Sequence, residues 1–479
     1  MNYSIIRYIL CWVLEFQALF LALPCIVAAY YGEKQGWMFL FVAVGCFAIG
    51  ALGRLKKAKS DVFYAREGFV TVSLSWIIMS LTGALPFFLT GEFDTYTDAL
   101  FETISGFTTT GASILSDVEA LSRCTMFWRC FTHWIGGMGV LVLILAVLPL
   151  AGGYNMYLMR AESPGPTVGK LVPRVRHTAR ILYEMYVLMT IVEIITLLLA
   201  GMPLYDSITL SFGTAGTGGF GLLNTGAAEY TATVQIILTV FMILFGINFN
   251  VYFLIRERKG LAALKYEEMR YYLGVIAVAI LLITVNVREF FTTIGETVRH
   301  VAFQVASIIT TTGFSTTDFN KWPEFSKFIL VILMFVGACA GSTGGGIKIS
   351  RVMIMAKLAK NEFSHLIHPK RVRQISLEKH VVNKETLRSI SVFFIAYTFI
   401  YATSVLLISL DNLDFTTNFT AVAATLNNIG PGLRMVGPTS NFSVYSDPAK
   451  YVLMFDMLAG RLELFPMLLL FAPSTWKRN

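Results

Sequence analysis

Four short segments that each end in glycine carry the groups needed to bind a cation stripped of its water. Segments 108–111 and 310–313 read TTTG, while 216–219 reads GTGG and 427–430 reads NNIG. Glycine is free to adopt positive φ, so the carbonyls before it can turn toward one axis. Four such segments around one axis would form a ring of oxygens able to replace the hydration shell of the ion.

The expected ligands are the backbone carbonyls of the two residues before each glycine, with the glycine supplying the turn. The four glycines follow one another after 108, 94 and 117 residues. A single segment of this kind is explained as well by a loop in which threonine caps a helix. Four equally placed segments favour a selectivity filter, made by Thr109, Thr110 and Gly111; Thr217, Gly218 and Gly219; Thr311, Thr312 and Gly313; and Asn428, Ile429 and Gly430.

The composition is that of a polytopic membrane protein. Of 479 residues, 55% are hydrophobic and only 14% are charged, which is too apolar for a soluble protein of this length. Apolar runs of roughly 20 residues can cross a bilayer. We expect ten spans, at about 5–31, 37–53, 68–90, 126–150, 178–201, 232–255, 271–288, 326–358, 388–410 and 449–472.

Four half-apolar stretches between these runs are too short to span, and each ends at one of the glycine segments: 95–108, 204–215, 296–310 and 415–427. They read as re-entrant pore helices, whose negative dipole ends would stabilise a cation. The sequence therefore predicts an all-α fold with pseudo-fourfold symmetry around one pore. We expect an N-terminal hairpin (1–62) and span–pore helix–span repeats at 63–160, 161–262, 263–376 and 377–479.

Charge is distributed as the positive-inside rule asks of a chain with a cytoplasmic N-terminus and C-terminus. Basic residues gather at 54–59, 170–180, 256–270 and 370–388, each after an even number of spans. The net charge of +8 is therefore assigned to orientation in the membrane and not to nucleic-acid binding. The opposite loops are mostly acidic, but Arg123, Arg129, Lys321 and Lys327 break that pattern.

The run at 326–358 contains five glycines between positions 337 and 346. Each glycine costs a helix about 1 kcal/mol relative to alanine, so the helix should break there. The alternative is a loop at a helix end, although the apolar run continues on both sides. A broken segment beneath the filter is a candidate gate, formed by Gly337, Gly341, Gly344, Gly345, Gly346 and Lys348.

Arg461 lies inside the last apolar run, where a charge is costly and usually functional or paired. Glu463 is an awkward partner because residues two apart do not share a helix face. Arg461 would set an electrostatic barrier to cations or hold the carbonyls of the glycine-rich segment. The alternative is snorkelling to an interface. His133 is expected to pack or donate a hydrogen bond and not to bind metal.

The chain resembles the bacterial Trk/Ktr potassium transporters and, through them, the plant HKT proteins. The resemblance rests on TTTGAS (108–113), TTTGFS (310–315), HWIGGMG (133–139), AGSTGGGIK (340–348) and the late Gly-Arg pair at 460–461. The extra N-terminal hairpin and the Gly-Pro-Thr at 165–167 are similar to the TrkH/TrkG branch. The resemblance implies filter glycines at 111, 219, 313 and 430, a gating loop at about 337–348 and a gate-facing Arg461.

The same resemblance implies a potassium channel-like uptake protein in the bacterial plasma membrane. It further implies a homodimer with one pore per chain and a cytosolic, TrkA-like regulatory subunit that binds nucleotides. This chain itself shows no nucleotide fold, so we expect no cofactor in it, with K⁺ as the permeant ligand. A symporter coupling K⁺ to Na⁺ or H⁺ is the alternative, and a membrane enzyme is a third reading that lacks a convergent catalytic set.

Overall fold

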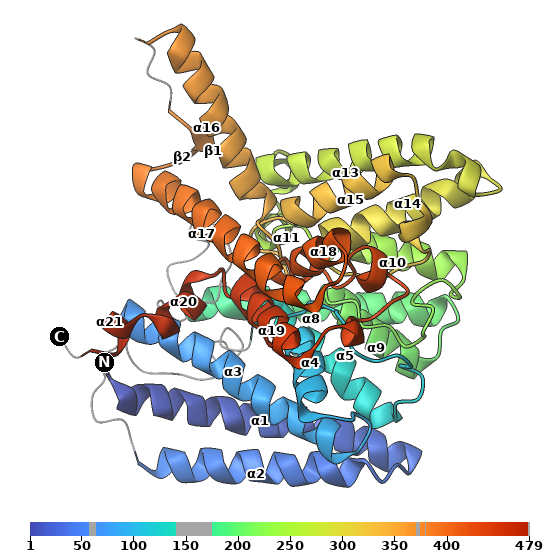
Figure 1. Ribbon diagram of the computed structural model, residues 1–479, viewed down its shortest axis with the longest axis vertical. Helices are drawn as coiled ribbons and strands as arrows, with labels where there is room; N and C mark the ends of the chain where they lie inside the picture. The colour runs from blue at the N-terminus through green and yellow to red at the C-terminus, as the bar shows by residue number, and fades with distance from the viewer. Residues whose placement is uncertain (57–63, 140–174, 370–373, 379, 478–479) are drawn as a thin grey trace.

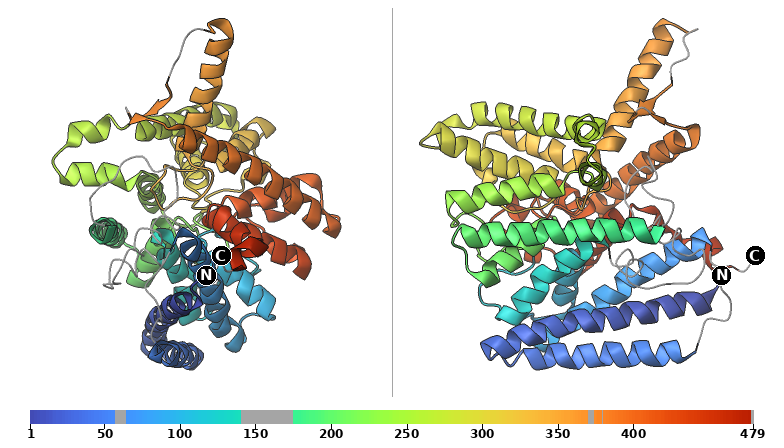
Figure 2. Two further views of the ribbon diagram at one scale, coloured as in Figure 1. Left: turned by 90° about the vertical axis from the view of Figure 1, so that its left-hand side faces the viewer. Right: turned by 180° about the vertical axis from the view of Figure 1, so that it is seen from behind.

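The computed structural model describes residues 1–56, 64–139, 175–369, 374–378 and 380–477 (Figure 1). Part of the run predicted at 126–150, the Gly-Pro-Thr at 165–167 and several members of the basic clusters lie outside these residues. Within them the chain is mostly helical, and the start of the first helix and the last helix, at 473–476, lie at the same end of the molecule (Figures 1 and 2).

The elements follow one another along the chain as long and short helices with one small hairpin of strands. They are α1 (Tyr3–Tyr31), α2 (Gly36–Leu55), α3 (Ala65–Leu89), α4 (Tyr96–Phe107), α5 (Arg123–Met138), α8 (Val175–Leu199), α9 (Leu204–Ala215), α10 (Ala232–Phe245), α11 (Phe249–Arg256), α12 (Gly260–Leu264), α13 (Glu267–Asn286), α14 (Ile294–Ile309), α15 (Glu324–Val336), α16 (Ile349–Ile367), β1 (Ser376–Leu377), β2 (His380–Val381), α17 (Lys384–Ile408), α18 (Phe415–Leu426), α19 (Asp447–Arg461), α20 (Phe465–Phe471) and α21 (Pro473–Trp476).

Helices α1 and α2 form a hairpin along one edge of the molecule (Figures 1 and 2). The outer face of α2 exposes large apolar side chains such as Trp37 and Phe41, as a lipid-facing helix does. The turn of the hairpin is tied to the rest of the protein by Glu33. Its carboxylate accepts the backbone N–H groups of Arg123 (2.7 Å) and Cys124 (2.8 Å), which are otherwise unpaired donors at the start of α5.

Six described helices are long and apolar enough to cross a membrane, or seven if the bent pair α10 and α11 counts as one span. The run expected at 326–358 is broken, as predicted. The runs at 232–255 and 449–472, which were expected to be continuous, are broken as well. The α10–α11 axis bends by 89°, and Glu463 and Leu464 adopt positive φ between α19 and α20.

Neither of these two further breaks carries a cluster of glycines. At the first, the Asn248 side chain caps α11 by accepting the N–H of Asn250 at 3.0 Å. At the second, α19 ends at Arg461 and α20 carries a proline in its first turn. Hydropathy averaged over about 20 residues does not reveal such breaks, because the residues on both sides are apolar and keep the average high.

A long helix, a short helix and a further helix follow one another four times: α3–α4–α5, α8–α9–α10, α13–α14–α15 and α17–α18–α19. The short helices α4, α9 and α18 each have 12 residues and α14 has 16. Each packs against the long helix before it. Helix α16 leaves the body of the molecule and projects beyond it (Figure 1).

Candidate functional site

The four short helices end in the same backbone turn. Two residues before each glycine, a non-glycine residue adopts the left-handed conformation, and the glycine itself follows with positive φ. Such backbone is strained for a residue with a side chain and persists only where the surroundings hold it. The φ values are 54° and 78° at Thr109 and Gly111, 54° and 78° at Thr217 and Gly219, 59° and 89° at Thr311 and Gly313, and 55° and 98° at Asn428 and Gly430.

A matched hydrogen bond closes each of these turns. In every case the N–H of the residue before the glycine donates to the carbonyl of a small residue five positions earlier, over 2.8 Å. The pairs are Thr110 with Ser105, Gly218 with Gly213, Thr312 with Ser307 and Ile429 with Ala424. In a trans peptide the N–H and the preceding C=O point in opposite directions, so the carbonyls of residues 109, 217, 311 and 428 point away from their own helices.

The glycines show that the four segments form a closed ring. A Cβ atom added to each would collide with the carbonyl oxygen of the residue before the next glycine. The order follows the chain and returns to its start: Gly111 to Gly218 O (1.9 Å), Gly219 to Thr312 O (1.9 Å), Gly313 to Ile429 O (2.2 Å) and Gly430 to Thr110 O (2.8 Å). The segments separated most widely in sequence are thus immediate neighbours in space.

The altered fourth segment keeps the helix end of the first and third. The hydroxyl groups of Thr108 and Thr310 each donate to the carbonyl four residues earlier, over 2.6 Å. In the fourth segment the amide Nδ2 of Asn427 donates to the carbonyl of Ala423, again four residues earlier, at 2.9 Å. Asparagine therefore supplies the hydrogen bond that threonine supplies elsewhere, and the departure from TTTG does not alter the turn.

The altered second segment is completed by a histidine from α5. A Cβ at Gly218 would lie 2.3 Å from His133 Cγ, so the imidazole occupies the space that a side chain at this position would need. His133 Nε2 accepts the N–H of Phe220 (3.2 Å), and Nδ1 lies 2.7 Å from the Gly106 carbonyl. These partners require a neutral ring with its proton on Nδ1. His133 was expected to pack or to form a hydrogen bond, and both contacts are observed, whereas its position against Gly218 was not anticipated.

The glycine-rich segment lies directly against the ring. Helix α15 ends at Val336 and α16 begins at Ile349, so the break falls where it was predicted. The N–H of Gly345 donates to the Thr311 hydroxyl over 2.6 Å. A Cβ at Gly345 would lie 2.6 Å from the Asn427 carbonyl oxygen. The close approach explains why glycine stands here.

Two cations hold this segment by its carbonyls. Lys348 is buried, has φ 76° and donates from Nζ to the Gly344 carbonyl. Arg461 donates from Nη1 to the Thr343 carbonyl at 3.0 Å and from Nη2 to the Gly137 carbonyl at 2.8 Å. Arg461 thus bridges the segment and the end of α5. Of the roles expected for it, holding carbonyls is observed, whereas snorkelling to an interface does not fit these contacts.

Glu463 pairs with Arg351 of α16 and not with Arg461, in line with the expectation from their spacing. The Arg351 guanidinium also stacks over the Phe393 ring, 4.1 Å from its centroid. The pair therefore connects the residues that follow α19 to α17 and to α16, which begins where the glycine-rich segment ends.

Glu268 and Asn248 were not anticipated as part of this site. Glu268 is buried at the start of α13, and its carboxylate accepts the N–H of Ala340 (2.6 Å) and the amide of Asn248 (3.1 Å). It thereby fixes the first half of the glycine-rich segment. In the sequence Glu268 lies within the basic cluster at 256–270. A carboxylate in such a charged stretch is expected at a solvated surface and not in a buried site.

The loops that follow the first two glycines are hydrogen-bonded to each other through polar side chains. Asn224 donates from Nδ2 to Asp117 Oδ1 (2.8 Å) and accepts the N–H of Val118 (2.8 Å). The hydrogen bond from Asn224 lowers the pKa of Asp117 from its ordinary value, so this exposed carboxylate stays ionised. Negative charge at this position attracts cations.

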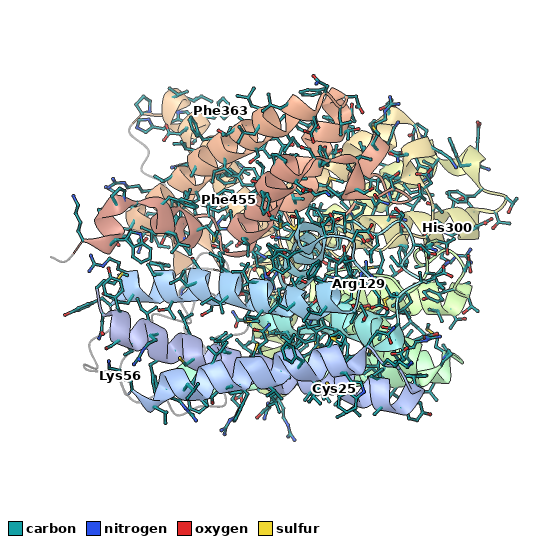
Figure 3. All side chains as sticks on the ribbon, turned by 60° about the horizontal axis from the view of Figure 1, so that its bottom comes forward. Cys25, Lys56, Arg129, His300, Phe363 and Phe455 are labelled. Carbon is teal, nitrogen blue, oxygen red and sulfur yellow. The ribbon has the colours of Figure 1, made fainter. Side chains whose placement is uncertain are left out.

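Arg129, expected to be an exception among acidic loops, does not lie in a loop but within α5. It is buried, with 2% of its side chain exposed, and pairs with Glu102 of α4 (Arg129 is labelled in Figure 3). Lys321 and Lys327 pair with Asp318 and Glu324 near the surface. Within the described ranges, His, Cys, Asp and Glu side chains do not gather in threes as a metal site.

Comparison with known proteins gives a consistent result along the whole chain. The sequence model of the TrkH family, described as a cation transport protein, matches residues 38–478. The Trk system potassium uptake protein TrkH of Salmonella typhimurium is 36% identical over 462 residues, 95% of each chain. TrkG of Escherichia coli is 34% identical over 462 residues, 95% of this chain and 94% of its own. The crystal structure of the potassium transporter TrkH from Vibrio parahaemolyticus superposes with a TM-score of 0.89 at 31% identity, covering all of both chains.

Proposed function

The chain belongs to the TrkH family of cation transport proteins, and on that basis we propose that it carries potassium into the cell through a channel-like pore. The observation that carries the proposal is the closed ring of four glycine-ended turns. In that ring each glycine lies against the carbonyl of the next segment. As a member of a family of transport proteins, the chain is a membrane protein and not an enzyme.

The selectivity filter is the set of carbonyls before Gly111, Gly219, Gly313 and Gly430. Backbone carbonyls are neutral dipoles that replace the hydration shell of K⁺ without holding the ion too tightly to leave. The C-terminal ends of α4, α9, α14 and α18 meet at the ring, and the negative poles of their dipoles favour a cation there. The four units expected at 63–160, 161–262, 263–376 and 377–479 supply one filter segment each.

The gate is the segment from Gly337 to Lys348. Its contact with Thr311 and Asn427 supports a position in the path that an ion leaving the ring would take. Lys348 and Arg461 hold it there and add positive charge that opposes a passing cation. Opening therefore requires the segment to leave its partners. Its glycine-rich backbone can change conformation at little steric cost, which favours such a movement.

The protein works in the bacterial plasma membrane with both termini in the cytoplasm. Their position at one end of the molecule supports this orientation (Figure 1). By analogy with the Trk system named for its relatives, it forms a homodimer with one pore per chain and is controlled by a cytosolic, TrkA-like nucleotide-binding subunit. The projecting α16, which continues directly from the gate segment, offers a surface for such a subunit.

Flux of K⁺, Rb⁺ and Na⁺ into liposomes containing the purified protein tests the proposal. Gly313→Ala should abolish K⁺ flux or its preference over Na⁺, because the added Cβ would lie 2.2 Å from the Ile429 carbonyl oxygen. Gly274→Ala in α13 is the matched control, since nothing lies within 4 Å of its Cβ position. Unchanged selectivity in the Gly313 variant would refute the filter.

The same liposomes separate a channel from a coupled transporter. A channel carries K⁺ down its own gradient alone, with no requirement for a Na⁺ or pH gradient. A strict requirement for either gradient would favour the symporter instead.

A further inference from the structure

A fully buried ion pair lies beside the ring and has no place in the proposed gate or filter. Arg129 Nε of α5 donates to Glu102 Oε1 of α4 over 2.6 Å, and the two side chains are 2% and 0% exposed. In Figure 3 the label of Arg129 lies near the middle of the view. Charges this deeply buried are costly unless their remaining hydrogen-bonding groups are satisfied, so their other partners are informative.

Each member of the pair also hydrogen-bonds to the segment of chain that follows one of the ring glycines. The Glu102 carboxylate accepts the Ser113 hydroxyl and the Ile114 N–H, both at 3.0 Å. Arg129 Nη1 donates to the Gly221 carbonyl at 3.0 Å. Ser113 and Gly221 occupy equivalent positions, two residues after the glycines of the first and second segments. The ion pair therefore connects two neighbouring segments of the ring at equivalent positions, two residues after each glycine.

The other two segments are held just beyond their glycines by their own short helices. In the third, the Ser307 hydroxyl of α14 donates to the Phe314 carbonyl (2.5 Å). In the fourth, the Leu433 N–H donates to the Thr420 hydroxyl of α18 (2.9 Å).

The second segment is supported from outside its own unit. Among the described residues, the hydrogen bonds that anchor Phe220 and Gly221 come from His133, Cys130 and Arg129 of α5. The Arg129 guanidinium also lies over the Phe220 ring, 3.6 Å from its centroid. The second segment, GTGG, which departs from the TTTG pattern, therefore depends on α5 for its position, and through Arg129 on Glu102.

We propose that Glu102 and Arg129 are positioning residues that set the discrimination between K⁺ and Na⁺. The inference rests on the proposed function of the ring as a filter. Discrimination against the smaller Na⁺ requires that the carbonyls resist closing around it, whether through cavity size or through the number of dipoles held in place. The ion pair supplies that resistance between the first and second segments just beyond Gly219, where the described hydrogen bonds of Phe220 and Gly221 come from α5 and not from α9.

The test compares K⁺ and Na⁺ flux through Glu102→Gln and Arg129→Lys in liposomes. Glutamine keeps the shape of the side chain but removes the charge, and lysine keeps the charge but cannot reach both Glu102 and Gly221. We expect the K⁺/Na⁺ flux ratio to fall about tenfold, as expected for loss of a hydrogen bond to a buried charged group, while K⁺ flux persists. Glu193→Gln in α8 removes an equally buried carboxylate and should leave the ratio unchanged.

The outcomes separate this inference from the filter proposal. If Gly313→Ala destroys selectivity while both pair variants keep the wild-type ratio, the filter stands and the role of the pair is wrong. If Gly313→Ala also leaves the ratio unchanged, the filter itself is wrong. Monodisperse elution and retained K⁺ flux report folding of each variant. Should Glu102→Gln fail to fold, the ratio measured for Arg129→Lys decides.

Discussion

The backbone N–H of Gly345 donates to the hydroxyl of Thr311 over 2.6 Å, so the glycine-rich segment is hydrogen-bonded to the ring itself. Thr311 is also the residue of the third segment that adopts φ 59°. The side chain thus contacts the proposed gate, while the carbonyl of the same residue belongs to the proposed filter. A displacement of the proposed gate therefore breaks or moves a hydrogen bond of the proposed filter, and the reverse also holds.

Removing the Thr311 hydroxyl should loosen the gate. Thr311→Ala loses the acceptor for Gly345, and a hydrogen bond of this kind contributes about 1 kcal/mol net. We expect K⁺ flux without a cytosolic partner to rise about fivefold, the factor that corresponds to that energy. Thr311→Ser retains the hydroxyl and should behave as wild type. Equal resting flux in the alanine, serine and wild-type proteins would mean that this bond does not restrain the segment.

Arg461 should be the stronger restraint, because it joins the segment to a second helix. Arg461→Gln loses the charge and cannot donate to Thr343 and Gly137 together. Charged hydrogen bonds contribute about 1.5–3 kcal/mol, so we expect resting K⁺ flux to rise by about tenfold or more. Arg461→Lys keeps the charge and should show a smaller rise. A loss of flux in the glutamine variant, with the protein folded, would contradict a restraining role.

His133 and Gly218 should show energetic coupling. A side chain at position 218 collides with the imidazole, so Gly218→Ala should abolish transport and lower the melting temperature. His133→Ala alone opens space and removes the acceptor for Phe220. In the double variant the alanine at 218 meets no ring, and we expect recovery of stability by about 1–3 kcal/mol relative to the sum of the single changes. Simple additivity would show that the two positions are independent.

The repeated turns could be predicted because their chemistry is local. A glycine with positive φ, threonines before it and a short helix ahead of them leave a signature within about 15 residues, and the chain repeats it. The break at 337–348 was predicted on the same grounds, since five glycines in ten residues disfavour a helix by their own propensity.

The supports of the ring could not be predicted, because they join residues distant in sequence. Glu102 and Arg129 are 27 residues apart, and Arg129 and Gly221 are 92 apart. Arg129 was read as a stray loop charge, since neither helix periodicity nor charge counts reveal its partner. The bend after Gly246 and the break after Arg461 were missed because single capping side chains and left-handed residues produce them within apolar surroundings.

The central claim is that four glycines form one ring in which each must lack a side chain. Its most direct measurement is the K⁺/Na⁺ flux ratio of four liposome preparations, carrying Gly111→Ala, Gly219→Ala, Gly313→Ala or Gly430→Ala. All four should lose selectivity. The loss should be mildest for Gly430, whose Cβ would lie 2.8 Å from the next carbonyl oxygen, against 1.9, 1.9 and 2.2 Å for the others. Wild-type selectivity in any of the first three would contradict the ring.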